Sequence, residues 1–132
     1  MDGIYEAFFT ALSGDSSLQT LLGGSATDKK VYPITNTGRS TLPAVRIAVV
    51  AGSSDLGLPI DRPVVDVLIA SNANATELNN IGSAIDAVLN RERLSGPNGA
   101  VLHVARKIAQ RDGYDPNTLE YRRVIRYQVI KT

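Results

Sequence analysis

The hydrophobic pattern is clearest in the middle of the chain, where an apolar run is followed by a helical stripe. Residues 62–70 are β-branched and apolar almost throughout, which predicts a strand that is central in a sheet or buried on both faces. From 75 to 91, apolar residues recur at steps of three and four, namely Leu78, Ile81, Ile85, Val88 and Leu89. We expect an amphipathic helix that is capped by Asn74, with the Glu77 carboxylate reaching back to the first turn. Such a helix needs a sheet against which to bury its stripe.

The rest of the chain supplies the strands of that sheet. Strands are predicted over 31–34, 43–50, 100–111 and 119–131, where β-branched or alternating residues are bounded by turn residues. Pro33 cannot donate to a ladder, which places the first of these strands at an edge or a strand end. A turn over 112–118 joins the last two strands, so we expect them to form an antiparallel hairpin.

The N-terminal segment 2–22 is predicted as two short helical pieces. Gly14 ends the first piece, and Asp15 or Ser16 caps the second. The apolar residues of the second piece, which we expect to pack in the core, are Leu18, Leu21 and Leu22.

The order of these elements, α-β-β-β-α-β-β, predicts the fold class. We expect a single α+β domain over residues 1–132, a length that is sufficient for one hydrophobic core. Its mostly antiparallel sheet of about five strands is expected to be covered by the N-terminal helical segment and the one long helix.

The segment between the second and third strands carries more apolar residues than a solvated loop needs. It spans 51–61, is rich in Gly and Ser, and is too long for a tight hairpin. Its large apolar residues are Leu56, Leu58 and Ile60. An extended hairpin arm with an apolar contact tip and a loop folded back onto its own domain both fit this composition.

Composition narrows the function classes only slightly. The formal net charge of +1 gives no overall argument for a nucleic-acid or membrane partner. The charge is unevenly distributed, however: from Ala100 onward seven bases and three acids give +4, whereas seven bases and ten acids before it give −3. The chain has no cysteine, no signal-peptide pattern and no apolar run of membrane-spanning length. We therefore expect a soluble protein that is intracellular when made.

No residue pattern points to catalysis, a metal or a cofactor. The single histidine, His103, lies in a predicted strand without a second ligand nearby in sequence. The run Gly23-Gly24-Ser25 lacks the lysine of a phosphate-binding loop, and no Gly-x-Ser-x-Gly nucleophile elbow occurs. Asp55, Asp61 and Asp66 do not follow the spacing of a calcium-binding loop. We expect a protein that is not an enzyme and needs no cofactor.

A basic run in the last strand, Arg122-Arg123-Val124-Ile125-Arg126, is the charge cluster that stands out. Strand alternation places Arg122 and Arg126 on one face and Arg123 on the other. One interpretation is a solvated edge or face of the sheet. The other is a contact with an acidic neighbouring subunit, or a channel wall that meets phosphate, and Lys107 in the preceding strand is grouped with these residues.

Several short motifs follow one another in a recognisable order: Leu21-Leu22-Gly23-Gly24, Val31-Tyr32-Pro33, Leu42-Pro43-Ala44-Val45, the stripe from Ile81 to Leu89, and the closing strand from Tyr121 to Tyr127. In order and spacing they resemble the tail terminator (tail completion) proteins of long-tailed bacteriophages, over nearly the whole chain. That family usually carries an aromatic residue, often Trp, in the central strand, where this chain has Val67-Leu68-Ile69.

The resemblance implies a structural role in a virion. Such proteins form a hexameric ring on the finished tail tube, stop its polymerisation and present a surface to the head-side connector. The implied partners are further copies of the chain, the tail tube protein and the head–tail connector of the neck. Genomic DNA would pass through the ring without sequence-specific binding, and no membrane is implied. The protein would be assembled in the host cytoplasm and reside in the tail or neck of the virion.

The resemblance also suggests which residues make these contacts. The residues of the loop arms that would touch the tube or the connector are Ser53, Asp55, Leu56, Leu58 and Arg39. The residues that would lie at a subunit contact or at the lumen of the ring are Arg122, Arg123, Arg126 and Lys107. A ring needs head-to-tail contacts between copies, and an uneven distribution of charge suits such contacts.

Other functions stay open on the sequence alone. A head–tail connector or adaptor protein of the neck belongs to the same class, and it would bind the portal rather than the tube. A small soluble binding domain with no phage role would need a convergent polar pocket, which the sequence does not display. A stand-alone DNA-binding module would bind DNA as a monomer, with strong salt dependence.

Deletion of Ser53 to Leu58 tests the arm hypothesis. We expect the fold to survive, because these residues lie outside the predicted strands, and we expect binding of the ring to tail tubes to be lost. Circular dichroism checks the fold, and co-sedimentation with purified tubes checks the binding. Unchanged tube binding by the folded deletion variant would contradict the hypothesis.

Overall fold

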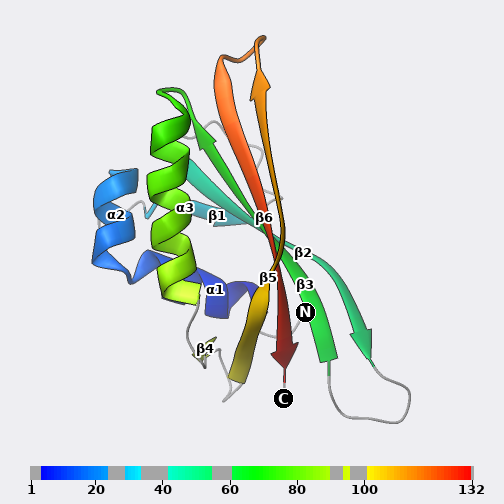
Figure 1. Cartoon of the computed structure of the whole chain (residues 1–132). Helices are drawn as coiled ribbons and strands as arrows, with labels where there is room; N and C mark the ends of the chain where they lie inside the picture. The colour runs from blue at the N-terminus through cyan, green and yellow to red at the C-terminus, as the bar shows by residue number, and fades with distance from the viewer. Residues whose placement is uncertain are drawn as a thin grey trace.

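The computed structural model places three helices against one six-stranded sheet (Figure 1). It describes residues 4–23, 29–33, 42–54, 61–89, 94–95 and 101–131. The helices are α1 (Ile4–Ser13), α2 (Ser16–Leu22) and α3 (Ala75–Leu89). The strands are β1 (Val31–Pro33), β2 (Ala44–Ser54), β3 (Asp61–Ser71), β4 (Leu94–Ser95), β5 (Val101–Asp115) and β6 (Glu120–Lys131).

The strand order across the sheet is β1-β2-β3-β6-β5-β4. Strand β1 is parallel to β2, and every other neighbouring pair is antiparallel. The predicted α+β class with a mostly antiparallel sheet is therefore confirmed, and so is the edge position of the strand that holds Pro33. The two-residue strand β4 was not predicted; its Ser95 pairs with Val101.

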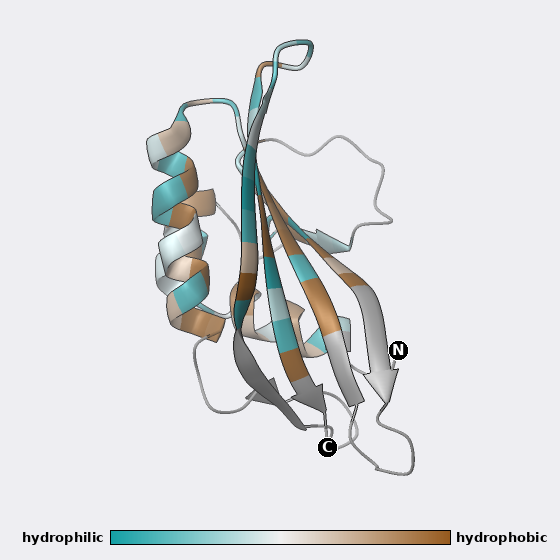
Figure 2. Ribbon diagram, turned by 45° about the vertical axis from the view of Figure 1, so that its right-hand side comes forward, coloured by the Kyte–Doolittle hydropathy of each residue, from teal (hydrophilic) through white to brown (hydrophobic). Residues whose placement is uncertain are grey.

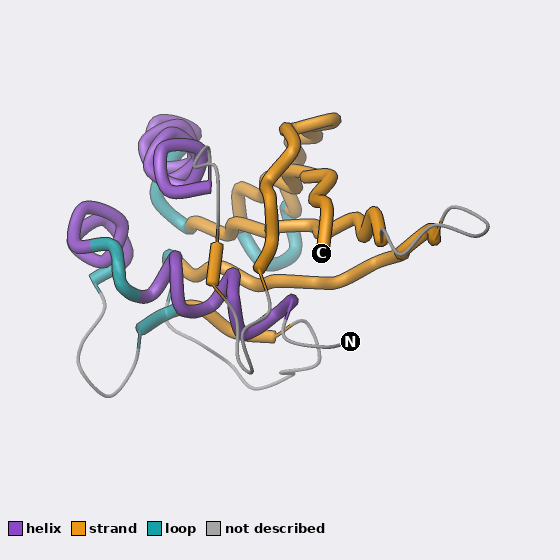
Figure 3. The backbone as a smooth tube through the Cα atoms, turned by 90° about the horizontal axis from the view of Figure 1, so that it is seen from below, coloured by secondary structure: helices purple, strands orange, loops and turns teal. Residues whose placement is uncertain are grey.

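Only one face of the sheet is covered by the helices (Figure 3). The strand residues that point toward the helices are buried, namely Val45, Ile47, Val65, Val67, Ile69, Ile125, Tyr127 and Val129. Their neighbours in β3, such as Val64 and Leu68, point the other way and are only half-buried. The strand over 62–70 is thus central, as predicted, but the alternative that both of its faces are buried is wrong. The alternation of hydrophobic and hydrophilic residues along the central strands is visible in Figure 2.

The two N-terminal helices meet at a capped break. The Gly14 N–H donates to the Thr10 carbonyl oxygen at 3.0 Å, and the Leu18 N–H donates to the Asp15 carboxylate at 2.9 Å. Gly23 closes α2 in the left-handed conformation, with φ of 70°. Leu18 is buried as predicted, but Leu21 is exposed, because a two-turn helix turns only one leucine per turn toward the core.

Helix α3 begins as the sequence predicts. The Glu77 N–H donates to the Asn74 side-chain oxygen at 2.8 Å. The Glu77 carboxylate, however, does not reach back to the first turn. It accepts a 2.6 Å hydrogen bond from the buried Ser71 hydroxyl, whose oxygen in turn accepts from the Ala73 N–H at 3.1 Å. This chain of hydrogen bonds ties the end of β3 to the start of α3.

The hairpin of β5 and β6 is longer than predicted. Asp112 and Gly113, which the sequence placed in a turn, pair with Arg123 and Arg122 across the ladder. The turn itself covers residues 116–119. Side-chain pairing across the strands outweighs the turn preference of Asp-Gly. The Asp112 carboxylate holds Arg123, and two rungs further on the rings of Tyr114 and Tyr121 pack edge to face with their centroids 4.8 Å apart.

The C-terminal half of α3 is tied to the sheet by a buried phenol. The Tyr127 hydroxyl donates to the Asp86 carboxylate, and the Lys107 ammonium lies 3.4 Å from the other oxygen of that carboxylate. Burial raises the pKa of Tyr127, and the hydrogen bond to Asp86 and the negative charge of Asp86 raise it further. A raised pKa in the folded state stabilises the fold below the unfolded pKa of about 10 and ceases to do so as the pH rises above it.

Replacing Tyr127 by Phe is expected to lower the free energy of unfolding by about 1–2 kcal/mol at neutral pH, because Asp86 loses its phenol donor. The same variant should lose less stability than the original protein as the pH rises above about 10, because no buried phenol remains to ionise. Urea unfolding at several pH values measures both effects. Tyr121→Phe is the control. If the Tyr127→Phe variant lost as much stability at alkaline pH as the original protein does, the assignment of this effect to the Tyr127 phenol would be contradicted.

Candidate subunit interface on the uncovered sheet face

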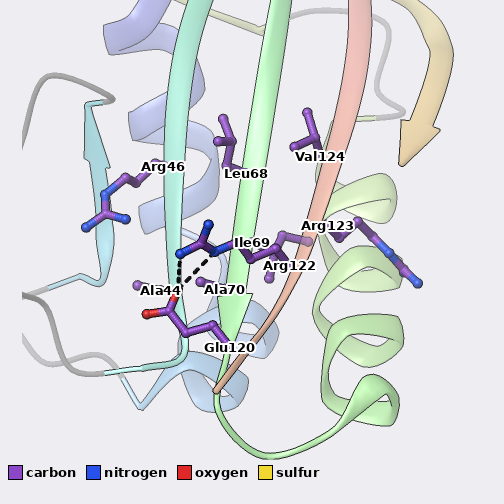
Figure 4. Close-up of a pocket in the computed structure, with 9 residues that line it drawn as sticks. All are labelled: Ala44, Arg46, Leu68, Ile69, Ala70, Glu120, Arg122, Arg123 and Val124. Carbon is purple, nitrogen blue, oxygen red and sulfur yellow. Dashed lines mark hydrogen bonds and ion pairs between the residues drawn. The ribbon is translucent and has the colours of Figure 1, made fainter. Parts of the chain in front are cut away.

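The sheet face that the helices leave open carries three neighbouring rows of residues. Each row crosses β2, β3, β6 and β5 in that order. The first row is Ala44, Ala70, Arg122 and Gly113, and the second is Arg46, Leu68, Val124 and Arg111. The third row is Ala48, Asp66, Arg126 and Ala109. We call these residues, together with Glu120, the uncovered face. Two shallow hollows of about 250 and 340 Å³ lie on it, and Figure 4 shows the smaller one.

Two arginines of the uncovered face, Arg122 and Arg126, hold carboxylates of their own chain. The Arg126 guanidinium donates to Asp66 at 2.8 and 3.1 Å, and the Arg122 guanidinium donates to Glu120 at 3.0 and 2.9 Å. Asp115 lies 3.4 Å from Arg122 as well. The hydrogen bond from Arg126 to Asp66 raises the pKa of Arg126. Arg126 thus contacts both carboxylate oxygens of Asp66 in the bidentate geometry that fixes the two side chains, whereas both nitrogens of Arg122 donate to one oxygen of Glu120.

Arg123 lies on the opposite side of β6, beneath α3. Its side chain is only 8% exposed. The guanidinium donates to Asp112 at 2.8 and 2.9 Å, to the Asn79 side-chain oxygen at 2.6 Å and to the Leu78 carbonyl oxygen at 3.4 Å. The hydrogen bond with Arg123 lowers the pKa of Asp112 and raises that of Arg123. Arg123 is therefore a polar link between β6, β5 and α3.

Gly82 makes room for this link. A Cβ atom added at Gly82 would lie 3.0 Å from a guanidinium nitrogen of Arg123, which is closer than most Cβ contacts in proteins. Figure 4 shows Arg123 turned away from Arg122 toward the helix. A glycine in the middle of a helix is unfavourable by about 1 kcal/mol relative to alanine, so the position needs a packing reason, and Arg123 supplies it.

The structure separates the four basic residues that the sequence grouped together. The predicted alternation is confirmed: Arg122 and Arg126 share the uncovered face, and Arg123 points to the other side. Lys107 lies on the helix side and faces Asp86, with both side chains about 40% exposed, where an ion pair contributes little to stability. Only Arg122 and Arg126 of the predicted set are thus brought together, and the assignment of the set to a subunit contact or lumen stays a prediction.

The predicted arm between β2 and β3 lies partly in the ladder. Ser53 pairs with Arg62 and Ser54 with Asp61, so the hairpin is paired up to its last described rung. Asp55, Leu56, Leu58 and Arg39 lie outside the described residues. In Figure 1 this hairpin and the β5–β6 hairpin end at opposite ends of the sheet, as the antiparallel register requires.

Two exposed apolar residues of the β5–β6 hairpin were not singled out from the sequence. Tyr114 is exposed near the end of β5, and Leu119, in the turn, is 63% exposed. The signal that could have identified them is that they flank the polar run 115–118, because polar residues are usual at such exposed positions. They add an apolar end to a hairpin whose strand β5 is exposed from Lys107 to Tyr114.

The described residues contain no group of three or more His, Cys, Asp or Glu placed to hold a metal ion. A search of the described helices finds none with the length and apolar character needed to cross a membrane. The side chain of His103 lies outside the described side chains.

Comparison with known proteins gives a match in structure. Neither a protein-family model nor a curated protein sequence matches this chain. Among the solved structures that match is a chain of the virion of a native gene transfer agent (GTA) particle, with a TM-score of 0.72 and 14% sequence identity. The match covers 98% of this chain and 94% of that chain. At this identity the match shows a shared fold.

Gly82→Ala tests the packing of Arg123 against α3. Alanine should stabilise the helix by about 1 kcal/mol. This gain should be largely cancelled as long as Arg123 is present, because the added methyl group displaces its guanidinium. In an Arg123→Met background the gain should appear, so that the two substitutions couple by about 0.5–1 kcal/mol. Urea unfolding of the four proteins measures the coupling. Ser83→Ala, on the exposed side of α3, should show no coupling, and additive effects of Gly82→Ala and Arg123→Met would contradict the packing argument.

Proposed function

We propose that this chain is a structural virion protein of the tail terminator type. Copies form a ring that caps the tail tube, ends its polymerisation and provides the joining surface for the head-side connector. The observation that carries the virion role is the match of almost the whole fold to a chain of a gene transfer agent virion, at 98% and 94% coverage. The order of the sequence motifs supports the narrower terminator role.

The distribution of surfaces supports assembly into a ring. A ring of identical copies needs two different contact surfaces on each copy, one for each neighbour. This fold offers a sheet face without helices and, on the other side, a helix layer. The two long hairpins end at opposite ends of the sheet, which suits a ring with one partner below and another above.

The proposed role uses no catalytic chemistry. The protein acts by shape and contact, as a structural component that is assembled in the host cytoplasm and stays in the tail or neck of the virion. DNA passes through the ring without sequence-specific binding. The paired arginines of the uncovered face support this, because Arg122 and Arg126 already hold carboxylates and offer little free charge to phosphate.

Native mass by light scattering, over a concentration series, tests the proposal. The protein is measured alone, with purified tail tubes, and with portal–connector complexes in place of tubes. We expect a hexamer, or a monomer that forms a ring on tubes, and tubes grown with the protein present should be capped and stop lengthening. A chain that stays monomeric and ignores tubes at every concentration would overturn the proposal. Binding to portal complexes but not to tubes would favour the neck adaptor instead.

A further inference from the structure

Charge is segregated between the two sides of the fold. The three helices carry Glu6, Glu77 and Asp86 and no lysine or arginine. The basic residues of the uncovered face are Arg46, Arg111, Arg122 and Arg126, against the acids Asp66 and Glu120 and the neighbouring Asp115. The helices therefore carry acids only, whereas bases outnumber acids on the uncovered face, within a chain whose overall net charge is only +1.

The solvent side of α3 is unusual for a surface helix. Its exposed residues all lack a charge, namely Ala75, Thr76, Asn79, Asn80, Ser83 and Ala87. The two acids of the helix are already engaged, Glu77 by the Ser71 hydroxyl and Asp86 by Tyr127 and Lys107. Helices that face water usually carry charged residues there, whereas depletion of charge is typical of the centre of a protein interface.

The uncovered face has the complementary organisation. Leu68 and Val124 lie side by side at its centre, half-buried, and the alanines at positions 44 and 70 continue this apolar strip. Figure 4 shows Leu68 and Val124 beside the hollow, with the Arg122–Glu120 pair at its margin. An apolar centre with charged pairs around it is the usual arrangement of a protein–protein contact.

We infer that the uncovered face of one copy is covered by the helix layer of a second copy, chiefly by the exposed side of α3. The contact is head-to-tail, so each copy uses its sheet face toward one neighbour and its helices toward the other. The inference rests on the proposed function, because it assumes that copies form a ring, and it adds which two surfaces meet. Of the bases on the uncovered face, Arg111 has no ion-pair partner within the described residues, so a layer of helices that carry acids and no bases suits it better than a second sheet face does.

Two charges without an ion pair agree with this direction. Within the described part of the chain, neither the exposed Glu6 of α1 nor the exposed Arg111 of β5 has an ion-pair partner. One belongs to the helix layer and the other to the uncovered face, so the two surfaces that we pair carry unpaired charges of opposite sign. DNA against the uncovered face is the competing occupant, and it would find Arg122 and Arg126 already paired with carboxylates.

Cross-linking tests the contact without interference from native thiols, since the chain has no cysteine. Val124→Cys marks the uncovered face, and Asn80→Cys, Ser83→Cys and Ala87→Cys mark successive turns of α3. Each α3 variant is mixed with the Val124 variant on tail tubes and treated with a short bis-maleimide. Asn117→Cys, in the exposed turn of the β5–β6 hairpin, replaces Val124→Cys in the control mixture. Arg111→Cys, an exposed position on the same face, is used if Val124→Cys does not fold.

We expect covalent dimers in at least one mixture of a face variant with an α3 variant, at least tenfold above the control mixture and above either variant alone. Dimers formed by the face variant with itself, or no face-to-helix dimers in rings whose native mass is normal, would overturn the inference and leave the proposed function standing. A protein that forms no assembly in the native mass measurement would overturn both.

Discussion

The guanidinium of Arg123 joins three elements that are far apart in the sequence, and the seat of α3 on the sheet depends on it. A buried cation would be costly alone, but this one has a carboxylate from β5 and two oxygens from α3 within hydrogen-bond reach. A glycine at position 82 lowers the helix propensity of α3 but leaves room for the guanidinium. Tyr127 and Asp86 fix the other half of the helix, so α3 is held at two polar points in addition to its apolar stripe.

These fixed points explain why one side of the sheet is closed and the other remains available. The helices are anchored by groups that point to one side of β6, namely Arg123 and Tyr127, while the alternate residues Arg122 and Arg126 use their charges within the sheet. Alternate residues of β6 thus anchor the helices on one side and form ion pairs on the other, which gives the fold two chemically different sides. The proposed head-to-tail assembly can use these two sides without a further element.

The sequence predicted what depends on short-range pattern. The period of two in the last strand assigned Arg122 and Arg123 to opposite faces, and the Asn74 cap was visible because it depends on residues three apart. What was missed depends on partners far along the chain. Asp112 precedes a glycine and so resembles a turn, and only the arginine eleven residues later shows that it belongs to the strand.

The candidate interface could be predicted only in part for the same reason. The basic run was recognisable, but sequence spacing does not reveal that Arg126 meets Asp66, sixty residues earlier, or that Arg111 joins the same face from β5. The apolar centre formed by Leu68 and Val124 likewise depends on the strand order, which places β6 beside β3 rather than at an edge. Long-range pairing, and not local propensity, assembles the surface.

The irregular pairing of β5 has a consequence for self-association through the edge of the sheet. Beyond Val101 and Leu102, the outer edge of β5 is not paired with any described strand, and such an edge invites pairing with other chains. The register of β5 shifts twice, between Val104 and Arg106 and between Lys107 and Ala109. Each bulge breaks the even spacing of outward-facing amides, so a second strand cannot extend along the edge without interruption. The bulges therefore disfavour fibrous self-association along this edge.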